Sequence, residues 1–254
     1  MDPATWQEQR RSFGAAAELY DRIRPSYPAA AIRWILGDAP LRVVDLGAGT
    51  GILTRQVVAL GHDVIPVEPD AGMRARAVAI GRAPRPVGGT AEAIPLGDGS
   101  VDAVVVGQSY HWFDADRAHR EVARVLRPGG VFGPVWNLRD EEVPWVAELS
   151  RHLYRAGGDT RRDARGDAKL QADPTFGPAF GPVERALFPH STVHTRASLL
   201  DLVHSRSYYL AADATRRRSV DAAVSELLDN HPDLAGREEF ELPYVTAAYR
   251  ARKS

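Results

Sequence analysis

The sequence predicts an α/β fold built on a doubly wound, mainly parallel sheet. Apolar runs that suit buried strands alternate with helix-compatible segments from about residue 41 to 137. This alternation is typical of parallel strands joined by helical crossovers. Hydrophobic residues make up 44% of the 254 residues, which is enough for a sizeable core. The chain has no cysteine, so disulfides, thiolate catalysis and cysteine-based zinc sites are excluded.

A glycine-rich turn after the first predicted strand is the most informative feature of the chain. The stretch 43–54 reads VVDLGAGTGILT, in which an apolar run carries Asp45 and then enters three alternate glycines. Glycine has no Cβ, so Gly47 and Gly49 allow a ligand to approach the backbone at the carboxyl end of a strand. A dinucleotide-binding fingerprint would require glycine at the position of Ile52. The pattern therefore argues against a dinucleotide.

An acidic residue ends the second predicted strand. The segment ILTRQVVAL predicts an amphipathic helix that stops at Gly61, and the strand HDVIPVEPD then reaches Glu68. A carboxylate at this strand end suits acceptance of hydrogen bonds from two ribose hydroxyls. The alternative is that Glu68 caps a helix beginning near Pro69 and Asp70.

The pattern D-x-G-x-G-x-G resembles the first motif of class I S-adenosylmethionine-dependent methyltransferases. The resemblance covers about residues 10 to 140: GGTAEAIPLGDGSVDAVVV is similar to the family's third and fourth segments, and RVLRPGGVFGPVWN to its helix, tight turn and fifth strand. The runs YDRIRPSYP, YHWFD and WNLRD resemble a subgroup of trans-aconitate methyltransferase-like enzymes that act on small molecules.

The resemblance implies a Rossmann-like, mainly parallel sheet of about seven strands with an antiparallel last strand and a helical cap. We expect one domain over 1–254, with an N-terminal helical cap at 10–38, a cofactor-binding core at 41–140, and a substrate cap with the last two strands at 141–254. The last two strands are expected in VERALFPHSTVHT and ELPYVTAAYRA, and a helix from Arg196 with Thr195 as its N-cap. Residues 158–182 read as a long surface loop, a candidate lid.

The resemblance also implies S-adenosyl-L-methionine as the cofactor and S-adenosyl-L-homocysteine as its product. The glycine loop would pack beside the methionine portion, with Asp45 near the amino group, Glu68 on the ribose and Thr90 at the adenine edge. Met73 would cover an adenine face or belong to the core. The expected cofactor-binding residues are Asp45, Gly47, Ala48, Gly49, Glu68, Pro69, Met73, Thr90, Ala91, Glu92 and Gln108.

A polar and aromatic cluster, QSYHWF, ends the strand that contains VDAVVVG and should lie at the reacting centre. His111 is the candidate general base because imidazole titrates near neutral pH, the alternative being that it orients the loop or the substrate. Arg24 could bind an acidic group or only favour solubility, and Tyr208 could line the substrate site or pack in the core. The expected substrate-binding residues are Tyr20, Arg24, Tyr27, Tyr110, Trp112 and Tyr208.

Charge and composition favour a small-molecule substrate. The formal net charge of −1 gives no general attraction to nucleic acid, and the two arginine clusters at 161–165 and 216–218 read as solvated surface. No apolar run is long enough for a membrane span, and the first residues do not resemble a secretory signal, so we expect a cytoplasmic protein. The eight histidines are scattered and form no H-x-x-x-H or H-E-x-x-H pair, so we expect no bound metal.

Two other function classes remain open on the sequence. An NAD-dependent oxidoreductase is one, although Ile52 and the lack of a Tyr-x-x-x-Lys motif argue against it. A non-catalytic S-adenosylmethionine-binding protein is the other. The methyl acceptor, the choice among oxygen, nitrogen and carbon, and the oligomeric state are not predicted from the sequence.

Overall fold

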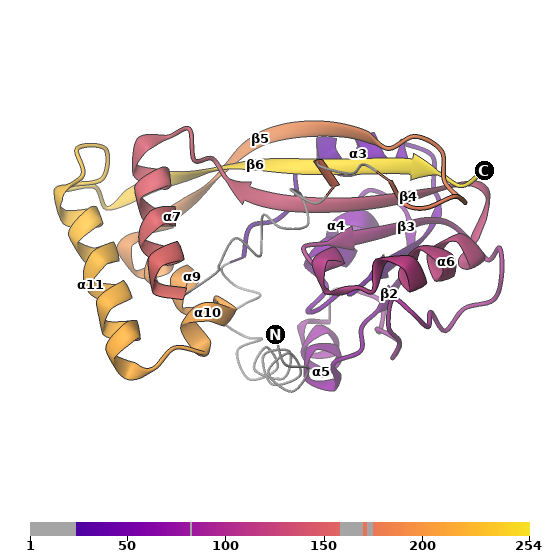
Figure 1. Ribbon diagram of the computed structural model, residues 1–254, viewed down its shortest axis with the longest axis horizontal. Coiled ribbons are helices and arrows are strands. Elements are labelled where there is room, and N and C mark those ends of the chain that lie inside the picture. Colours follow the sequence, from indigo (N-terminus) through magenta and orange to yellow (C-terminus); the bar gives the residue numbers. More distant parts are fainter. Residues whose placement is uncertain (1–23, 82, 158–169, 172–174) are drawn as a thin grey trace. The chain divides into compact units, whose positions relative to one another are not determined.

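Six strands form one sheet in the order β2-β1-β3-β4-β6-β5 (Figure 1). The structure is a computed structural model that describes residues 24–81, 83–157, 170–171 and 175–254. The strands are β1 (Arg42–Leu46), β2 (Asp63–Val67), β3 (Val101–Gly107), β4 (Leu126–Arg139), β5 (Glu184–Thr195) and β6 (Glu239–Arg252). The helices are α3 (Ala29–Leu36), α4 (Ile52–Ala59), α5 (Ala71–Ile80), η1 (Tyr110–Trp112), α6 (Ala115–Val125), α7 (Pro144–Gly157), α9 (Arg196–His204), α10 (Ser207–Leu210) and α11 (Ala214–Asn230).

The chain divides into two compact units, and β4, β5 and β6 contribute residues to both. Unit 1 comprises Met1–Pro25, Leu138–Arg162 and Pro189–Val245. Unit 2 comprises Ser26–Asn137, Asp163–Phe188 and Thr246–Ser254. Each unit has its own group of buried apolar side chains, so each is described separately below.

Unit 2 contains the parallel part of the sheet. β1 pairs in parallel with β2 and β3, and β3 pairs in parallel with β4. Alternate side chains of each strand face opposite sides of the sheet. One set, which includes Val105 and Val135, packs with α3 and α4 side chains such as Ile35 and Leu53. The near-continuous apolar composition of these strands is what a sheet covered on both faces requires.

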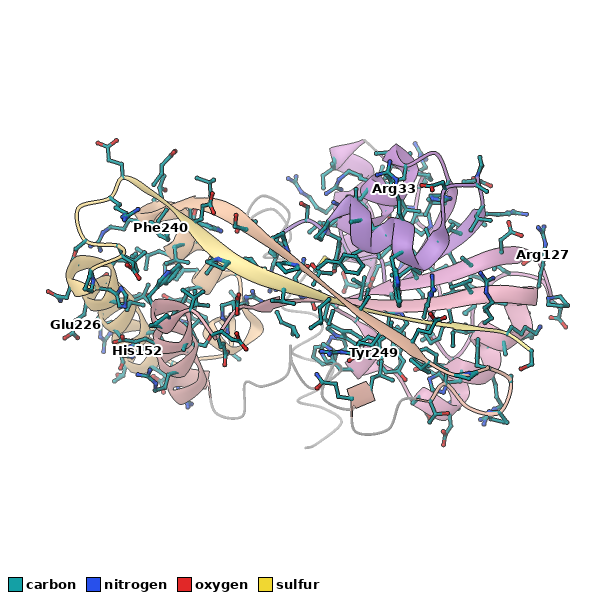
Figure 2. The ribbon with its side chains drawn as sticks, turned by 90° about the horizontal axis from the view of Figure 1, so that it is seen from above. Arg33, Arg127, His152, Glu226, Phe240 and Tyr249 are labelled. Atoms are coloured by element: carbon teal, nitrogen blue, oxygen red, sulfur yellow. The ribbon has the colours of Figure 1, made fainter. Side chains whose placement is uncertain are left out.

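An aromatic group provides further packing in unit 2. The Tyr110 ring lies edge-on to Trp136 and Phe176, and Trp136 lies edge-on to Tyr249 of β6, which is labelled in Figure 2. Phe132 and Trp136 alternate along β4 with Val131 and Val135, which belong to the other apolar group. The period of two therefore separates an aromatic from an aliphatic set on the same strand.

The last strand runs antiparallel to its neighbours. Gly129 N–H donates to Lys253 O at one end of the β4–β6 pair, and Asp140 N–H donates to Pro243 O at the other. The residue numbers rise on β4 as they fall on β6, which is the antiparallel pattern. Figure 1 shows the β6 arrow opposed to that of β4.

The sequence predicts seven strands, but the sheet of the described residues has six. The resemblance implies a third strand just before GGTAEAIP, and at this place the structure has only an isolated parallel bridge between Val87 and Val67. Val87 N–H donates to Pro66 O, and its own carbonyl accepts from Glu68 N–H. Pro66 of β2 has no N–H to donate to the carbonyl of Arg85, so the next hydrogen bond of the ladder toward the N-terminus cannot form.

The tight turn expected over 127–130 is instead part of β4, which begins at Leu126. Gly129 does adopt a positive φ of 75°. The backbone around it is nevertheless paired, because Gly130 O accepts from Lys253 N–H and Gly129 N–H donates to Lys253 O. Long-range pairing with the C-terminal residues therefore overrides the local turn preference of Pro-Gly-Gly.

Unit 1 encloses its own core of side chains from α7, α9, α11 and β6. Val146, Leu149, Leu199, Val224 and Leu242 are at most 1% exposed. The expected N-cap is present at α9, where the Thr195 side chain accepts from Ser198 N–H. In the parts of the chain that the structure describes, no helix combines the length and apolarity needed to cross a membrane.

Candidate functional site

The order of the strands places the candidate site at the ends of β1 and β3. From β1 the chain passes to β2 on one side and then to β3 on the other, so the direction of winding reverses between β1 and β3. Ligands of open α/β sheets bind in the crevice beyond the carboxyl ends of strands at such a switch point. The glycine-rich turn follows β1, and Gln108 and Ser109 follow β3.

The glycine turn is held against both neighbouring strands. Gly47 and Ala48 N–H groups donate to Val67 O at the end of β2, at 2.8 and 3.1 Å. Ser109 Oγ donates to Leu46 O, and a Cβ at Gly47 would lie 2.5 Å from that Oγ. Gly47 is therefore required by the approach of the Ser109 loop as well as by its φ of 73°.

Gly49 differs from Gly47 in what surrounds it. A Cβ built on Gly49 would meet no atom of the described residues within 4 Å. Its φ of 57° still favours glycine. Space beside the backbone at this turn is the feature expected where a ligand packs.

Asp45 lies inside the fold below this turn. Its side chain is 1% exposed, and Thr54 Oγ1 of α4 donates to Asp45 Oδ2 at 2.5 Å. Burial raises the pKa of the Asp45 carboxyl from 3.8 to about 7, an effect that Thr54 opposes and the nearby Glu68 increases. Thr54 was not singled out from the sequence, although its place on the buried face of α4 is a usable signal.

Glu68 connects the glycine turn to the start of α5. Its Oε2 accepts from Gly49 N–H at 2.9 Å, and its Oε1 accepts from Asp70 N–H at 2.8 Å. The N-cap of α5 is Asp70, whose side chain accepts from Met73 N–H, so Glu68 is not the N-cap. These two hydrogen bonds hold the Glu68 carboxylate beside the glycine turn, and its ribose role stays a prediction.

The expected adenine-edge residues form a short turn next to the end of β2. Thr90 and Ala93 exchange two backbone hydrogen bonds, and Ala91 between them is buried. Glu92 Oε1 accepts from Asp114 N–H, which connects this turn to the start of α6. Met73 is 6% exposed on α5, a burial that fits either of its expected roles.

The residue after β3 has an unusual backbone. Gln108 has a φ of 58°, and it is the single non-glycine residue with positive φ among those described. Its N–H donates to Val135 O, and its Nε2 donates to Asn137 O at 3.1 Å. Its Oε1 is buried and has no hydrogen-bond partner in the described part of the chain. Such strain and an unsatisfied acceptor are more common at functional sites than elsewhere.

The loop that carries the candidate base lies next to the glycine turn. His111 and Trp112 are half-buried in η1, with their rings 4.9 Å apart. A ring carbon of Phe113 is 3.8 Å from the position of a Cβ on Gly47. Tyr110, in contrast, is 4% exposed, and its hydroxyl is 2.8 Å from His119 Nε2 inside the aromatic group. Tyr110 therefore supports the loop from below.

The remaining expected substrate residues are divided between the two units. Tyr27 is 6% exposed in unit 2, and its backbone exchanges two hydrogen bonds with the Gln56 side chain. Arg24 belongs to unit 1, and Tyr208 lies there on α10. Tyr20 lies outside the described residues, as does most of the candidate lid at 158–182.

Unit 1 also holds a polar group centred on Asp221 of α11. Asp221 of α11 binds His204 Nε2 at 2.8 Å and accepts from the Tyr209 hydroxyl at 2.9 Å, and the His204 and Tyr209 rings stack. His204 and Tyr209 are five residues apart in the sequence and lie on two different helices. It ties α9 and α10 to α11.

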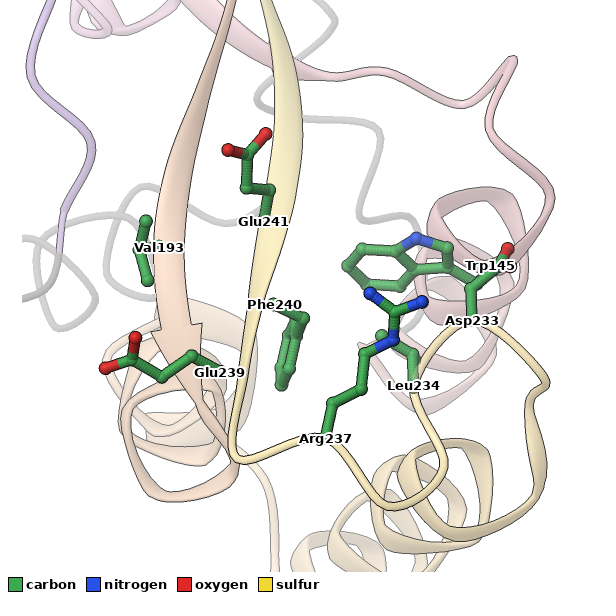
Figure 3. A pocket seen from close by; sticks show the side chains of 8 residues that line it. All are labelled: Trp145, Val193, Asp233, Leu234, Arg237, Glu239, Phe240 and Glu241. Atoms are coloured by element: carbon green, nitrogen blue, oxygen red, sulfur yellow. The ribbon is translucent and has the colours of Figure 1, made fainter.

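A cavity of about 570 Å³ opens on unit 1 beside α7 and the start of β6 (Figure 3). Its lining is Trp145, Val193, Asp233, Leu234, Arg237, Glu239, Phe240 and Glu241. None of these residues was expected at the site, and the glycine turn, Glu68 and Gln108 belong to unit 2. Across the described residues, no group of three or more His, Asp or Glu side chains could hold a metal ion.

The comparison with known proteins agrees with this architecture. A family model described as a methyltransferase domain matches residues 44–133, which contain β1 to the middle of β4 and hence the glycine turn, Glu68 and Gln108. A solved structure described as a putative type II methyltransferase from Anaeromyxobacter dehalogenans shares the fold, with a TM-score of 0.64, 24% identity, and coverage of 91% of this chain and 97% of that one.

Full-length relatives define the family. An uncharacterized methyltransferase from Mycobacterium tuberculosis is 46% identical over 242 residues, covering 94% of this chain and 95% of the relative. An uncharacterized methyltransferase-like protein from Schizosaccharomyces pombe is 33% identical and covers 96% of both chains. The chain therefore belongs to this methyltransferase family, and it is a class I S-adenosylmethionine-dependent methyltransferase.

Proposed function

We propose that the protein transfers the methyl group of S-adenosylmethionine to an oxygen, nitrogen or carbon nucleophile of a small molecule. The observation that carries the proposal is the convergence of the glycine turn, Glu68 and Gln108 at the carboxyl ends of three neighbouring strands. The cofactor is implied by the family, and the small-molecule acceptor by the net charge of −1 and by the aromatic strand-end loop.

The residues present fit this cofactor. Gly49 leaves open space beside the turn, and Glu68 places its carboxylate there. Gln108 Oε1 is a buried acceptor without a hydrogen-bond donor among the described residues. Thr90, Ala91 and Glu92 would border the adenine, and Met73 would cover one adenine face. When bound, the cofactor supplies an activated methyl group, so the protein chiefly provides alignment and exclusion of water.

A protein of similar fold whose structure contains S-adenosylhomocysteine supports the choice of cofactor. The phosphoethanolamine N-methyltransferase 2 of Haemonchus contortus, solved with phosphomonomethylethanolamine and S-adenosylhomocysteine, has a TM-score of 0.52 at 15% identity, covering 94% of this chain and 57% of that one. A malonyl-[acyl-carrier protein] O-methyltransferase from Methylococcus capsulatus is 40% identical over 138 residues, 47% of each chain. Amines and carboxylates therefore both belong in an acceptor screen.

The first experiment is calorimetric titration of the protein with S-adenosylhomocysteine, with NADH as the control. We expect micromolar binding of S-adenosylhomocysteine and no heat from NADH, because the turn carries Ile52 where a dinucleotide fingerprint has glycine. Binding of NADH alone would replace the proposal with the oxidoreductase alternative. Binding of S-adenosylhomocysteine without turnover of any acceptor would favour a non-catalytic binding protein.

His111 is the proposed general base, since its loop lies against the glycine turn. His111→Ala should lower turnover at least about tenfold on a hydroxyl or amine acceptor, because general bases contribute about 10²–10⁴-fold. Affinity for S-adenosylhomocysteine should stay near that of the wild type. His152→Ala, which removes an imidazole that is not among the expected site residues, is the matched control. Unchanged turnover in His111→Ala would remove this residue from the chemistry.

A further inference from the structure

One arginine of unit 2 folds back over the end of β2. Arg74 is the fourth residue of α5, and its Nη1 donates to Glu68 O and to Pro69 O, each at 2.8 Å. Side chains of an α-helix lean toward its N-terminus, so a long side chain at this position can reach the segment before the helix. Arg74 therefore ties α5 to the two residues that follow β2.

The start of a helix is an unfavourable place for a cation. It carries a partial positive charge, which repels a guanidinium beside it. In the part of the chain that the structure describes, Arg74 has no ion pair to offset this repulsion, and its hydrogen bonds go to the two backbone carbonyls. Solubility does not account for the arrangement, because Arg74 is half-buried, whereas Ala75 and Ala79 of the same helix are exposed. The placement of the guanidinium indicates that it holds this segment.

The guanidinium also packs against the segment that leads to the expected adenine-edge turn. A Cβ built on Gly88 would lie 3.6 Å from Arg74 Cζ, which is an ordinary van der Waals distance. Thr90, which begins the turn, is two residues further along the chain. Arg74 therefore contacts both the backbone of the expected ribose residue and the segment before the expected adenine residues.

Glu68 is held through its backbone as well as its side chain. Its N–H donates to Val87 O at 3.1 Å, and its carbonyl accepts from Arg74. Its carboxylate oxygens accept from the N–H groups of Gly49 and Asp70. Of these contacts, the one to Arg74 comes from a side chain and the others from backbone groups. A substitution at Arg74 can therefore release the Glu68 backbone without altering the glycine turn.

We propose that Arg74 is a positioning residue for the nucleoside part of the cofactor. By fixing the Glu68 backbone against the Gly88 segment, it keeps the Glu68 carboxylate in one place beside the glycine turn, where it accepts from the ribose 2′-hydroxyl. Arg74 acts through Glu68, not by its own contact with the ribose. The inference rests on the proposed function, which assigns Glu68 to the ribose.

The test compares S-adenosylhomocysteine with its 2′-deoxy analogue, and calorimetry gives the dissociation constant of each. The wild type should bind the deoxy analogue at least about tenfold more weakly, because the analogue loses a hydrogen bond to a charged group. Arg74→Met keeps most of the side-chain length but removes the donors. It should lower this preference to less than about threefold, mainly by weakening S-adenosylhomocysteine. Arg74→Lys, which keeps a donor, should retain most of the preference.

The matched control is Arg85→Met, because Arg85 is exposed three residues before Gly88 and has no hydrogen bond or ion pair within the described residues. It should keep the preference of the wild type. If Arg74→Met does not fold, Arg74→Gln, whose side chain is too short for both carbonyls, tests the same loss.

Weakening of both probes by the same factor in the Arg74 variants would show a general structural role and overturn the inference. An unchanged preference in these variants, or equal affinity of the wild type for the two probes, would overturn it as well. Failure of the wild type to bind S-adenosylhomocysteine would instead refute the proposed function.

Discussion

Burial of the Asp45 carboxyl makes the stability of the folded protein depend on pH. Its carboxyl is enclosed below the glycine turn and accepts a hydrogen bond from the Thr54 hydroxyl. Burial disfavours the charged form and raises the pKa to about 7, against an ordinary value of 3.8. The folded chain therefore keeps a proton on Asp45 in a range of pH where the unfolded chain has released it.

We expect the free energy of unfolding to fall as the pH rises from about 4 to about 7, since the folded state binds the extra proton in that window. The contribution of Asp45 is on the order of 4 kcal/mol. Asp45→Asn, whose amide oxygen can still accept from Thr54, should remove the part of the pH dependence of the unfolding free energy that Asp45 causes. Urea denaturation at several pH values measures it. Asp63→Asn, on a side chain that is 74% exposed, is the control. An unchanged slope in Asp45→Asn would contradict the assignment.

At the scale of elements, one arginine holds the loop before β3 onto α6. Arg124 donates to the carbonyls of Ile94 and Leu96, and its guanidinium pairs with Glu121 and Asp98. These contacts keep the pKa of the Glu121 carboxyl below its usual range, with the Arg124 hydrogen bond as the main cause. The loop from 89 to 98 includes the expected adenine-edge turn, so its position matters to the site.

Arg124→Ala should lower the free energy of unfolding by about 1–3 kcal/mol, because it leaves buried carbonyl groups without their donor. Arg120→Ala, on the exposed side of the same helix, should change it by less than about 0.5 kcal/mol. Chemical denaturation of both variants gives the comparison. Equal effects would mean that the loop is held by other contacts.

At the scale of the whole molecule, two separate apolar cores make local stability differ between the units. Leu199 is fully buried in the core of unit 1, whereas Val43 and Ala103 are fully buried in that of unit 2. A cavity created in one core removes contacts within that core. Opening reactions can therefore be confined to one unit.

Leu199→Ala should destabilise unit 1 by about 2–5 kcal/mol. Amide hydrogen exchange should become faster in α7, α9 and α11 and stay unchanged in β1 and β3. Binding of S-adenosylhomocysteine should protect the ends of β1 and β3 in the variant as in the wild type. Faster exchange throughout both units would show that the chain opens as one cooperative body.

Local sequence patterns were sufficient to predict the elements and turns that depend on neighbouring residues. The alternation of apolar runs and helical segments predicted β1, α4, β2 and β3, and the hydroxyl of Thr195 predicted the start of α9. The glycine turn was recognised because positive φ and the absence of a Cβ are properties of the residue itself. These features depend on contacts within a few residues of the chain.

Features that depend on contacts between distant residues could be seen only in the tertiary structure. Lys253 pairs with Gly129 and converts an expected turn into strand, and nothing near residue 129 encodes that pairing. The Thr54 hydroxyl under Asp45 and the Asn137 carbonyl beside Gln108 likewise arise from packing between elements. The sequence by itself determined the family, the order of the elements and the residue types at the site. The burial of Asp45 and the orientation of Gln108 required the fold, because hydrogen-bond geometry and desolvation depend on which distant segments pack together.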